Sequence, residues 1–246
     1  MIEVTYIDHM GNDLSVVNAA RVSFGKKSEL VEGVVKEDEQ GDYLEMVLSE
    51  RDAKLIKYLA KYKHKSPFNH TFVTFHVKAP IFVARQLQKH EYMPWNEISR
   101  RYVDDDPEFY FPLTWRGRST DKKQGSEGEV KSNFNINYHT MTALKGYQQM
   151  LDEGVAPEQA RMVLPQSMMT EWYWSGTVYA FAKMCQLRMQ QDTQQESREV
   201  AMQVYEYMEK LYPESWKALM KQAWRTCVSC GNPSKGDFCG FCLEEE

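Results

Sequence analysis

A dense group of polar and charged side chains lies between Arg85 and Arg101. Arginine forks bind phosphate in bidentate geometry, lysine adds a point charge, and amide and carboxylate groups can read the edge of a polar ring. These residue types predict a surface for an anion and an amide-bearing ring. A solvated charged loop is the alternative that spacing alone leaves open. The members are Arg85, Gln86, Lys89, His90, Glu91, Asn96, Glu97, Ser99, Arg100 and Arg101.

Two regular elements precede this group and must position it. Residues from Thr71 to Val77 alternate between the two faces of a predicted strand. Pro80 then suits the first turn of a helix whose buried face is supplied by residues from Ile81 to Leu87. Binding residues concentrate on loops that a rigid element holds in place. We therefore expect the polar group to follow a strand and a short helix.

The remaining chain predicts an α+β fold, with a small sheet followed by a helical half. We expect irregular, exposed segments at 29–43 and 116–133. No GxGxxG motif is present, so a bound dinucleotide would not be held in the Rossmann manner. The other expected elements are a strand at 2–7 and helices from Asp13, from Ser49, over 137–154, from Pro157, over 168–189, from Thr193 or Ser197 to Tyr212, and over 213–224.

The overall composition excludes some classes of protein. A chain of 246 residues can bury one sizeable core and carry a small appendage, here residues 1–224 and 225–246. The net charge of −5 and the pI near 5.8 argue against bulk nucleic-acid binding, which shows a basic footprint. No apolar run has transmembrane length and no signal peptide is evident. We expect a soluble, cytoplasmic protein with no membrane association.

The cysteines divide into one internal residue and four in the tail. Two Cys-x2-Cys pairs predict a structural zinc site, with disulfides as the weaker alternative in a cytosolic chain. Four thiolates would leave the metal no open position for catalysis. Cys185 lies among apolar residues at helical spacing, which indicates core packing and not a nucleophile. The predicted zinc ligands are Cys227, Cys230, Cys239 and Cys242.

The segment from Lys89 to Arg101 resembles the signature of the flavin-dependent thymidylate synthases, usually written RHRxxSxNExSxR. Lys89 and Glu91 stand where the family has arginine, and Pro94 replaces its first serine. Lys89 keeps the charge and loses the fork, whereas Glu91 reverses the charge. The matching positions are His90, Asn96, Glu97, Ser99 and Arg101.

Other segments resemble further elements of that family, in the same order along the chain. The turn HKSPFNH matches H-x-T/S-P-F-E-H, with Asn69 in place of glutamate. Arg161 lies in an AR-x-VLP pattern, and Arg188 ends the apolar helix where the family has an arginine. Ser23, in AARVSF, matches a position close to the flavin.

The resemblance implies reductive methylation of dUMP to dTMP. It implies 5,10-methylenetetrahydrofolate as carbon donor, NADPH as reductant, FAD as cofactor, and a homotetramer with shared active sites. Arg188 would favour the ionised form of the uracil ring. The nucleotide would be bound by Gln86, Lys89, Glu97, Ile98, Ser99, Arg100, Arg101 and Arg161. The flavin would be lined by Ser23, His64, Ser66, Lys89, His90, Glu91, Glu97, Thr177, Tyr179 and Lys183.

Two rival functions follow from the departures and from the tail. Glu91 and Asn69 could retune flavin binding, so that another pyrimidine modification results. Alternatively, the chain could be a non-enzymatic nucleotide-binding or nucleic-acid-binding module that uses the zinc tail. Lys183 could also restore the positive charge that Glu91 removes.

Overall fold

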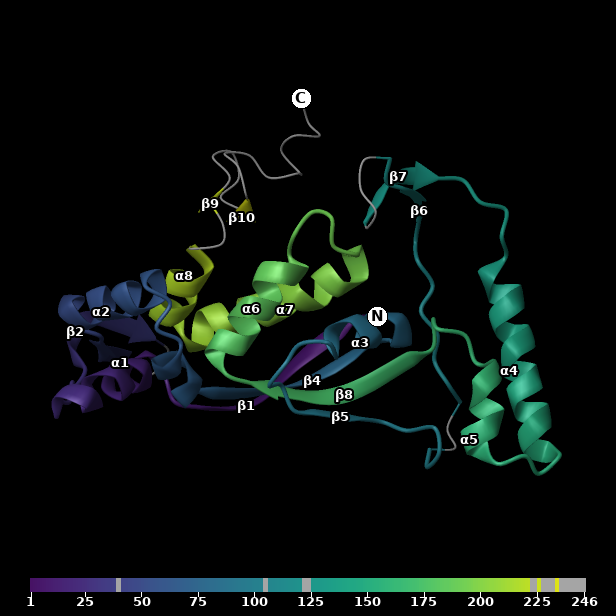
Figure 1. Ribbon diagram of the computed structural model, residues 1–246, viewed down its shortest axis with the longest axis horizontal. Helices are drawn as coiled ribbons and strands as arrows, with labels where there is room; N and C mark the ends of the chain where they lie inside the picture. The colour runs from purple at the N-terminus through teal and green to yellow at the C-terminus, as the bar shows by residue number, and fades with distance from the viewer. Residues whose placement is uncertain (39–40, 104–105, 121–124, 222–224, 227–232, 235–246) are drawn as a thin grey trace. The chain divides into compact units, whose positions relative to one another are not determined.

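The computed structural model (Figure 1) describes residues 1–38, 41–103, 106–120, 125–221, 225–226 and 233–234. The chain divides into two compact units. The first unit comprises Met1–Ile7, Phe75–Ser175 and Arg188–Gln203. The second unit comprises the described residues of Asp8–Thr74, Gly176–Leu187 and Val204–Glu246. Each unit is therefore built from segments that are far apart in the sequence.

A four-stranded sheet, in the order β1-β4-β8-β5, forms the centre of the first unit. Its strands are β1 (Glu3–Met10), β4 (Phe72–Pro80), β8 (Met169–Gly176) and β5 (Trp95–Glu97), and the ends of β1, β4 and β8 belong to the second unit. Phe75, Val77 and Ala79 of β4 are fully buried on one face. β5 pairs with β8 in antiparallel register, so that Trp95 lies opposite Trp174. The strands predicted at 2–7 and 71–77 are confirmed.

The single long helix predicted over 168–189 is wrong, because this segment forms β8 and then α6 (Val178–Arg188). Thr170, Trp172 and Trp174 are buried, whereas Tyr173 between them is exposed. This is the period of two that a strand requires. Threonine and tryptophan also favour a pleated, half-buried surface over a helix. The high apolar content of the whole segment concealed this alternation.

The helices of the first unit include α3 (Ile81–Leu87), α4 (Ile136–Asp152) and α5 (Pro157–Ala160), which continues into η3 (Arg161–Val163). Figure 1 shows α4 and α5 side by side. The first half of α7 (Gln195–Leu211) also belongs to this unit. These helices confirm the predictions at Ile81, over 137–154, at Pro157 and before Tyr212.

The segment expected to be irregular over 116–133 instead contains an antiparallel hairpin of β6 (Trp115–Arg118) and β7 (Ser126–Val130). Trp115 lies opposite Val130, and Gly117 lies opposite Glu127. A Cβ atom on Gly117 would lie 2.7 Å from the carbonyl oxygen of Glu127. Glycine therefore permits the close approach of the two strands here.

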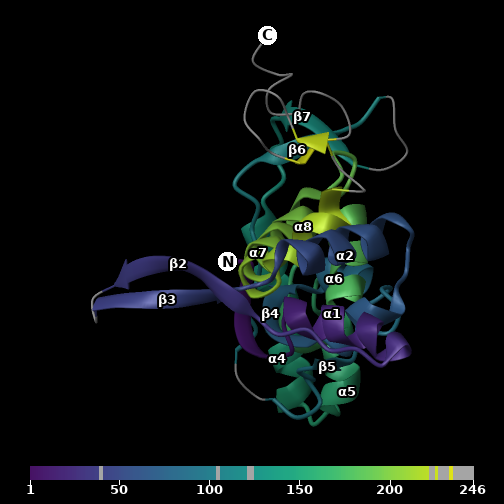
Figure 2. The same ribbon diagram turned by 90° about the vertical axis from the view of Figure 1, so that its left-hand side faces the viewer.

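Helices form most of the second unit: α1 (Asp13–Arg21), η1 (Val22–Phe24), α2 (Glu50–Lys61), η2 (Ser66–His70), most of α6, the second half of α7, and α8 (Pro213–Lys221). α2 packs on α8 (Figure 2). α1 begins at Asp13 as predicted, and Asn12 caps it by accepting a bond from the Ser15 amide at 3.1 Å. Asp13 accepts from the amides of Glu214 and Ser215 at 2.8 and 2.9 Å, which joins α1 to the start of α8.

A second hairpin, of β2 (Val31–Asp38) and β3 (Gly41–Val47), replaces the irregular segment expected at 29–43. Figure 2 shows it extending away from α1 and α2. Valine enrichment explains the strands, and the side chains of Val34 and Val35 remain exposed. The α+β class predicted from the sequence is confirmed.

The C-terminal tail is described only at β9 (Arg225–Thr226) and β10 (Pro233–Ser234), which pair in antiparallel fashion. The predicted zinc ligands Cys227, Cys230, Cys239 and Cys242 lie outside the described residues, and the division at residue 224 stays a prediction. In the described part of the chain, no group of three or more His, Cys, Asp or Glu residues could hold a metal ion. Of the helices described, none is long and apolar enough to cross a bilayer.

Candidate functional site

Arg188, the last residue of α6, lies at the centre of a hydrogen-bonded cluster in the first unit. Its Nε donates to Nε2 of His90 at 3.0 Å, and its Nη2 donates to the main-chain oxygen of Gln86 at 2.9 Å. Burial lowers the pKa of this guanidinium. Among the described residues, no carboxylate pairs with Arg188. A partly desolvated cation that lacks a counter-ion favours an anionic ligand.

His90 is a neutral partner for that cation. Because its Nε2 accepts the bond from Arg188, this nitrogen carries no proton. Burial, assisted by the charge of Arg188, lowers the pKa of His90 to about 4. The ring also lies 6.4 Å from that of Trp174, measured between centroids. At neutral pH the histidine therefore orients Arg188 without cancelling or repelling its charge.

The side chain of Gln86 is held from α7. Ser197 Oγ donates to Oε1 of Gln86 at 3.0 Å, and Nε2 of Gln86 donates to Oε1 of Gln194. These contacts leave the amide one N–H and one lone pair for a ligand. Sequence reasoning missed both Gln194, which directly precedes α7, and Ser197 in its first turn. The available signal is that Ser197, fully buried, shares a helix face with Val200 and Ala201, where an apolar side chain is expected.

Glu97 is held at the edge of the sheet. Its Oε1 accepts from Oγ1 of Thr170 at 2.7 Å, and its Oε2 accepts from Nε1 of Trp95 at 3.0 Å. Trp95 in turn stacks on Trp172, with centroids 4.3 Å apart and planes at 18°. The amide of Ile98 donates to the oxygen of Glu171 at 3.0 Å, which extends the pairing of β5 with β8. The carboxylate is exposed but fixed in direction.

The residues after Ile98 form a turn. The amide of Tyr102 donates to the oxygen of Ser99 at 2.9 Å, and both Nε and the amide of Arg101 donate to Oγ of Ser99 at 3.4 Å. The guanidinium of Arg101 lies 4.9 Å from the ring centroid of Tyr102. No general base contacts the Ser99 hydroxyl in the described residues, and its assignment as a binding residue stays a prediction. Arg100 is half-buried and makes contacts of its own.

Lys89 and Glu91, where the chain departs from the signature, are both exposed. Neither side chain makes a hydrogen bond or an ion pair within the parts of the chain that are described. Between Glu91 and Met93, Tyr92 adopts a positive φ of 59°, which is strained for an aromatic residue. Met93 is buried at the end of this turn. The strained turn thus directs Lys89 and Glu91 outward while Met93 anchors the loop.

Arg161 begins η3 and is exposed. Its side chain has no hydrogen-bond or ion-pair partner in the described chain, so the structure does not join it to the cluster around Arg188. Its neighbours Met162 and Val163 are also exposed, Met162 to 73%. The Arg161 guanidinium therefore has no partner among the described residues of one chain, and the apolar side chains beside it are solvent-exposed.

Most of the predicted flavin residues lie in the second unit, and most of them are exposed. Ser23 lies in η1, His64 follows α2, and Ser66 begins η2. The ring of His64 stacks on that of Tyr58, with centroids 5.9 Å apart. This stacking orients the imidazole, while the hydroxyls of both serines remain accessible to a ligand.

Asn69, a departure from the family pattern, is hydrogen-bonded to the predicted flavin residue Thr177. Thr177 Oγ1 donates to Oδ1 of Asn69 at 3.0 Å, and it also accepts from the amide of Ala180 at 3.2 Å, which caps α6. In the first turn of α6, the ring centroid of Tyr179 lies 5.9 Å from Nζ of Lys65. Lys183, one turn further along α6, is exposed. Hydroxyls and ammonium groups are donors that suit the phosphates of a flavin dinucleotide.

Cys185 lies on the opposite, buried side of α6 and is inaccessible. Burial raises the pKa of its thiol, so no thiolate forms near neutral pH. The expectation that it packs in the core is confirmed.

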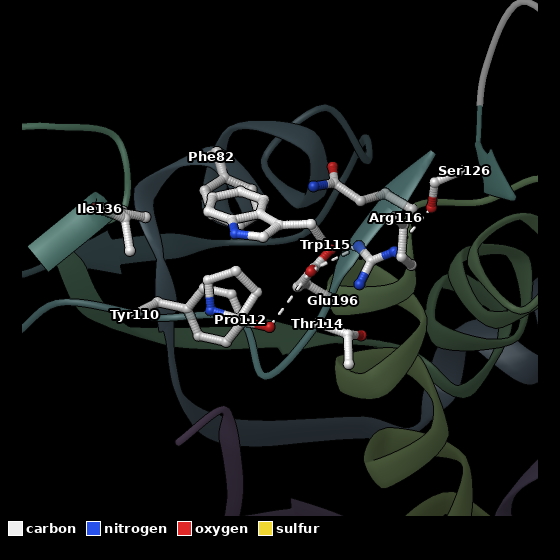
Figure 3. A pocket seen from close by; sticks show the side chains of 11 residues that line it. Phe82, Tyr110, Pro112, Thr114, Trp115, Arg116, Ser126, Ile136 and Glu196 are labelled. Atoms are coloured by element: carbon white, nitrogen blue, oxygen red, sulfur yellow. Dashed lines mark hydrogen bonds and ion pairs between the residues drawn. The ribbon is translucent and has the colours of Figure 1, made fainter. Parts of the chain in front are cut away.

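The first unit also contains a cavity of about 250 Å³ beside the start of α7. Figure 3 shows apolar side chains around it and an ion pair between Arg116 and Glu196 at one end. Nη2 of Arg116 donates to the two oxygens of Glu196 at 2.7 and 2.9 Å. Burial, with Glu196 nearby, raises the pKa of Tyr110 to about 12. Gln194, the partner of Gln86, also lines the cavity, which sequence reasoning did not find.

Comparisons with known proteins agree with the resemblance seen in the signature. A family model described as "Thymidylate synthase complementing protein" matches residues 5–214. A flavin-dependent thymidylate synthase from Thermus thermophilus is 36% identical over 218 residues, covering 87% of this chain and 74% of that protein. One from Thermotoga neapolitana is 34% identical over 223 residues, covering 90% and 92%.

Solved structures agree as well. The crystal structure of the UMP/dUMP methylase PolB from Streptomyces cacaoi, bound with 5-Br dUMP, has a TM-score of 0.74 and 31% sequence identity, covering 90% of this chain and 95% of that one. A second structure of the same methylase, bound with 5-Br UMP, has a TM-score of 0.73 and 29% identity. This chain belongs to the flavin-dependent thymidylate synthase family.

Proposed function

We propose that this enzyme catalyses the reductive methylation of dUMP at C5 of the uracil ring, with dTMP as the product. The carbon donor is 5,10-methylenetetrahydrofolate, and the reductant is NADPH. The observation that carries this proposal is the Arg188 cation, which is partly buried, fixed by His90 and Gln86, and without a carboxylate partner among the described residues. An anionic ring supplies the missing negative charge.

In this proposal Arg188 activates the pyrimidine. Two of its nitrogens are engaged with His90 and Gln86, and Nη1 remains to face the ring. A preorganised cation stabilises negative charge that develops on the uracil when N3 loses its proton. Because His90 is neutral, it holds the guanidinium without adding a competing charge. The chain thereby orients the activating group before the nucleotide arrives.

The other substrate contacts are divided between ring and phosphate. The remaining donor and acceptor of the Gln86 amide match a polar ring edge, and the fixed carboxylate of Glu97 lies on the loop that follows. Arg101 and Arg161 provide forks for the phosphate. The nucleotide-binding set is Gln86, Lys89, Glu97, Ile98, Ser99, Arg100, Arg101 and Arg161.

FAD fits the donor set of the second unit, whose accessible hydroxyls and ammonium groups suit its phosphates. When bound, the flavin supplies the redox chemistry that links NADPH to the nucleotide. Lys183 provides the positive charge that Glu91 does not provide. The residues proposed to hold FAD are Ser23, His64, Ser66, Lys89, His90, Glu91, Glu97, Thr177, Tyr179 and Lys183.

The active form is proposed to be a homotetramer with shared active sites. Exposed Arg161, flanked by exposed Met162, supports this because a neighbouring subunit can satisfy both side chains. Mixing Arg161→Ala with Arg188→Ala protein should restore activity, since some sites then combine intact residues from both chains. No recovery after subunit exchange, verified by mass spectrometry of mixed tetramers, would contradict shared sites.

The tail is proposed to bind one structural zinc ion through Cys227, Cys230, Cys239 and Cys242. The pairing of Thr226 with Pro233 supports this, because it brings together the flanks of the first cysteine pair. Metal analysis should find one zinc per chain, and a Cys227→Ser/Cys230→Ser variant should lose it. Full occupancy in that variant would exclude these ligands.

The proposed reaction is tested by product analysis with purified protein. The protein should be yellow and bleached by NADPH, and dUMP with methylenetetrahydrofolate should yield a product that carries one additional methyl group. A hydroxymethylated product would instead support a different pyrimidine modification. Colourless protein that binds nucleic acid with a steep salt dependence would favour a binding module.

UMP is a second candidate substrate, because the solved methylase with 31% identity is described as acting on UMP and dUMP. Competition between equimolar dUMP and UMP, followed by mass analysis of both products, measures the preference. Exclusive formation of dTMP would remove this candidate.

A further inference from the structure

The second unit carries a polar hollow that none of the predicted site residues lines. It lies between the end of α1, the segment after η1 and the start of α2, and its volume is about 380 Å³. Its lining combines four basic residues, two hydroxyls and one carboxylate. We call it the basic hollow, and its residues are Arg21, Lys26, Lys27, Ser28, Ser49, Arg51 and Asp52.

Asp52 is the one carboxylate among the described residues that line the basic hollow, and it is already engaged. Asp52 is buried and accepts from Nε of Arg21 at 3.1 Å, from Ser28 Oγ at 3.0 Å and from Ser49 Oγ at 2.9 Å. Burial opposes the charge of Asp52, but these hydrogen bonds outweigh it and lower the pKa of the carboxyl. Asp52 therefore neutralises Arg21 and has no capacity left for the other cations.

The side chains of Lys26, Lys27 and Arg51 remain exposed. None of these three side chains forms a hydrogen bond or an ion pair within the described ranges. Like charges that share one hollow repel each other unless an anion joins them. Separate solvated lysines would not need a common concavity. The arrangement therefore favours a ligand with more than one negative charge.

The frame around these cations is rigid. Ser28 is clamped to α1, since its amide donates to Oδ1 of Asn18 at 2.7 Å and its oxygen accepts from Nδ2 of Asn18 at 3.1 Å. Gly25 closes η1 with a positive φ of 61°, and the amide of Lys26 donates to the oxygen of Arg21 at 3.2 Å. The chain thus holds the two lysines beside the start of α2 before a ligand binds.

We propose that the basic hollow binds a phosphate group of a dinucleotide used in the reaction. This inference rests on the proposed function, because that function supplies the dinucleotides. Ser23, which is assigned to the flavin, lies in η1, and Gly25 and Lys26 follow that helix directly. A dinucleotide bound near Ser23 can therefore extend to the basic hollow. Small-molecule sites usually occupy about 300–1,000 Å³, so this hollow suits a phosphate with part of its nucleoside. The phosphate belongs either to NADPH or to FAD.

The first arm of the test uses adenosine 2′,5′-bisphosphate, which carries the 2′-phosphate of NADPH without the nicotinamide. Its affinity for the flavin-containing protein is measured by calorimetry. Lys26→Ala/Lys27→Ala should weaken binding about tenfold or more, since two charge-assisted contacts are lost. The matched control is Lys54→Ala/Lys61→Ala on α2, which removes the same charge outside the hollow and should change affinity less than twofold.

The second arm measures FAD affinity for the same variants after flavin removal. A loss of bisphosphate affinity assigns the hollow to NADPH, and a loss of FAD affinity assigns it to the flavin; either supports a phosphate site. Unchanged affinity for both ligands, in variants with normal circular dichroism, overturns the proposal. Neither arm needs turnover. Wild-type protein that fails to form dTMP would therefore refute the proposed function independently of the hollow.

Discussion

The two units present their predicted site residues in different states. In the first unit, Arg188, His90 and Gln86 are half-buried and joined by direct hydrogen bonds, with Ser197 beneath them. In the second unit, Ser23, Ser66 and Lys183 are exposed. One set is assembled by the chain itself, whereas the other offers donors that a ligand must bring together.

This difference has consequences for energy and for function. A preorganised polar cluster requires no reorganisation when charge develops, so it suits activation of a substrate. Its members also contribute to stability, because removing one leaves partners unsatisfied. Exposed donors contribute little to folding and mainly to cofactor affinity. Substitutions in the cluster of the first unit should therefore lower both turnover and stability. Substitutions of the exposed donors in the second unit should lower only flavin affinity.

Arg188→Ala should have the largest effect. Removing one preorganised donor at developing charge lowers turnover by roughly 10²–10³-fold, and we expect dTMP formation to fall at least that far. Flavin content should remain close to normal, because the exposed donors of the second unit are intact. Single-turnover formation of dTMP and the flavin absorbance of the same sample measure the two quantities. Arg118→Ala, an exposed arginine at the end of β6, is the control. Loss of flavin with normal turnover per bound flavin would reverse the assignment.

Arg161→Ala tests the exception within the first unit. As an exposed phosphate contact it should weaken dUMP binding by about 1.5–3 kcal/mol, or roughly 10- to 150-fold. The melting temperature without dUMP should change little, since the side chain has no partner within the described chain and one exposed contact to a neighbouring subunit contributes little to stability. Titration of dUMP and a thermal melt of the same preparation provide both values. An unchanged dissociation constant would exclude Arg161 as a phosphate clamp.

The sequence predicted the elements that have one clear period. The alternation at 71–77 fits only a strand, and the apolar stripe of α4 fits only a helix. The α+β class followed from such elements. β8 was missed because tryptophans and methionines also fit a buried helix, and periodicity over a short apolar run does not separate the two. The hairpins at β2–β3 and β6–β7 were missed because their acidic and glycine-rich composition is equally typical of loops.

The residues of the candidate site were predictable where a motif indicated them and not where the fold alone brings them together. His90, Glu97 and Arg188 followed from the signature and its companions. Gln194, Ser197 and Glu196 lie more than a hundred residues from Phe82 or Gln86, to which α7 brings them close. A serine on an apolar helix face indicates a buried hydrogen bond, but it does not identify the partner.

Ser197→Ala should have an intermediate effect, divided between stability and substrate binding. It leaves the half-buried Oε1 of Gln86 without its donor, which costs about 1–3 kcal/mol of unfolding free energy. Because Gln86 then loses its fixed orientation, KM for dUMP should rise while flavin reduction by NADPH is unchanged. Chemical denaturation and the two kinetic measurements test this division. A purely structural role would lower stability and leave KM as in the wild type.

His90 should make the first unit sensitive to acid. The pKa of an unfolded histidine is near 6.5, whereas in the folded protein it is about 4. Between these values the unfolded state binds more protons, so the unfolding free energy is complete above pH 6.5 and decreases as the pH falls towards 4. Because His90 is partly exposed and solvent screens its charge, the loss is below that of the full pKa shift and on the order of 2 kcal/mol. His90→Gln should flatten this dependence in denaturant titrations at pH 4.5 and 7. If the unfolding free energy decreases equally with pH in the wild type and in His90→Gln, groups other than His90 cause the acid sensitivity.

Asn69→Ala should have the smallest effect, and it tests the second unit. The bond from Thr177 to Asn69 is exposed, so its loss should cost only a few tenths of a kcal/mol of stability. Thr177 keeps its bond from the amide of Ala180, so α6 retains its cap. Asn69→Glu restores the family residue and offers a carboxylate to the same hydroxyl. Both variants should bind FAD within about threefold of the wild type, since an exposed neutral bond is worth little in water. A hundredfold change in turnover from either variant would place a preassembled catalytic element in the second unit as well, and the contrast between the units would then not hold.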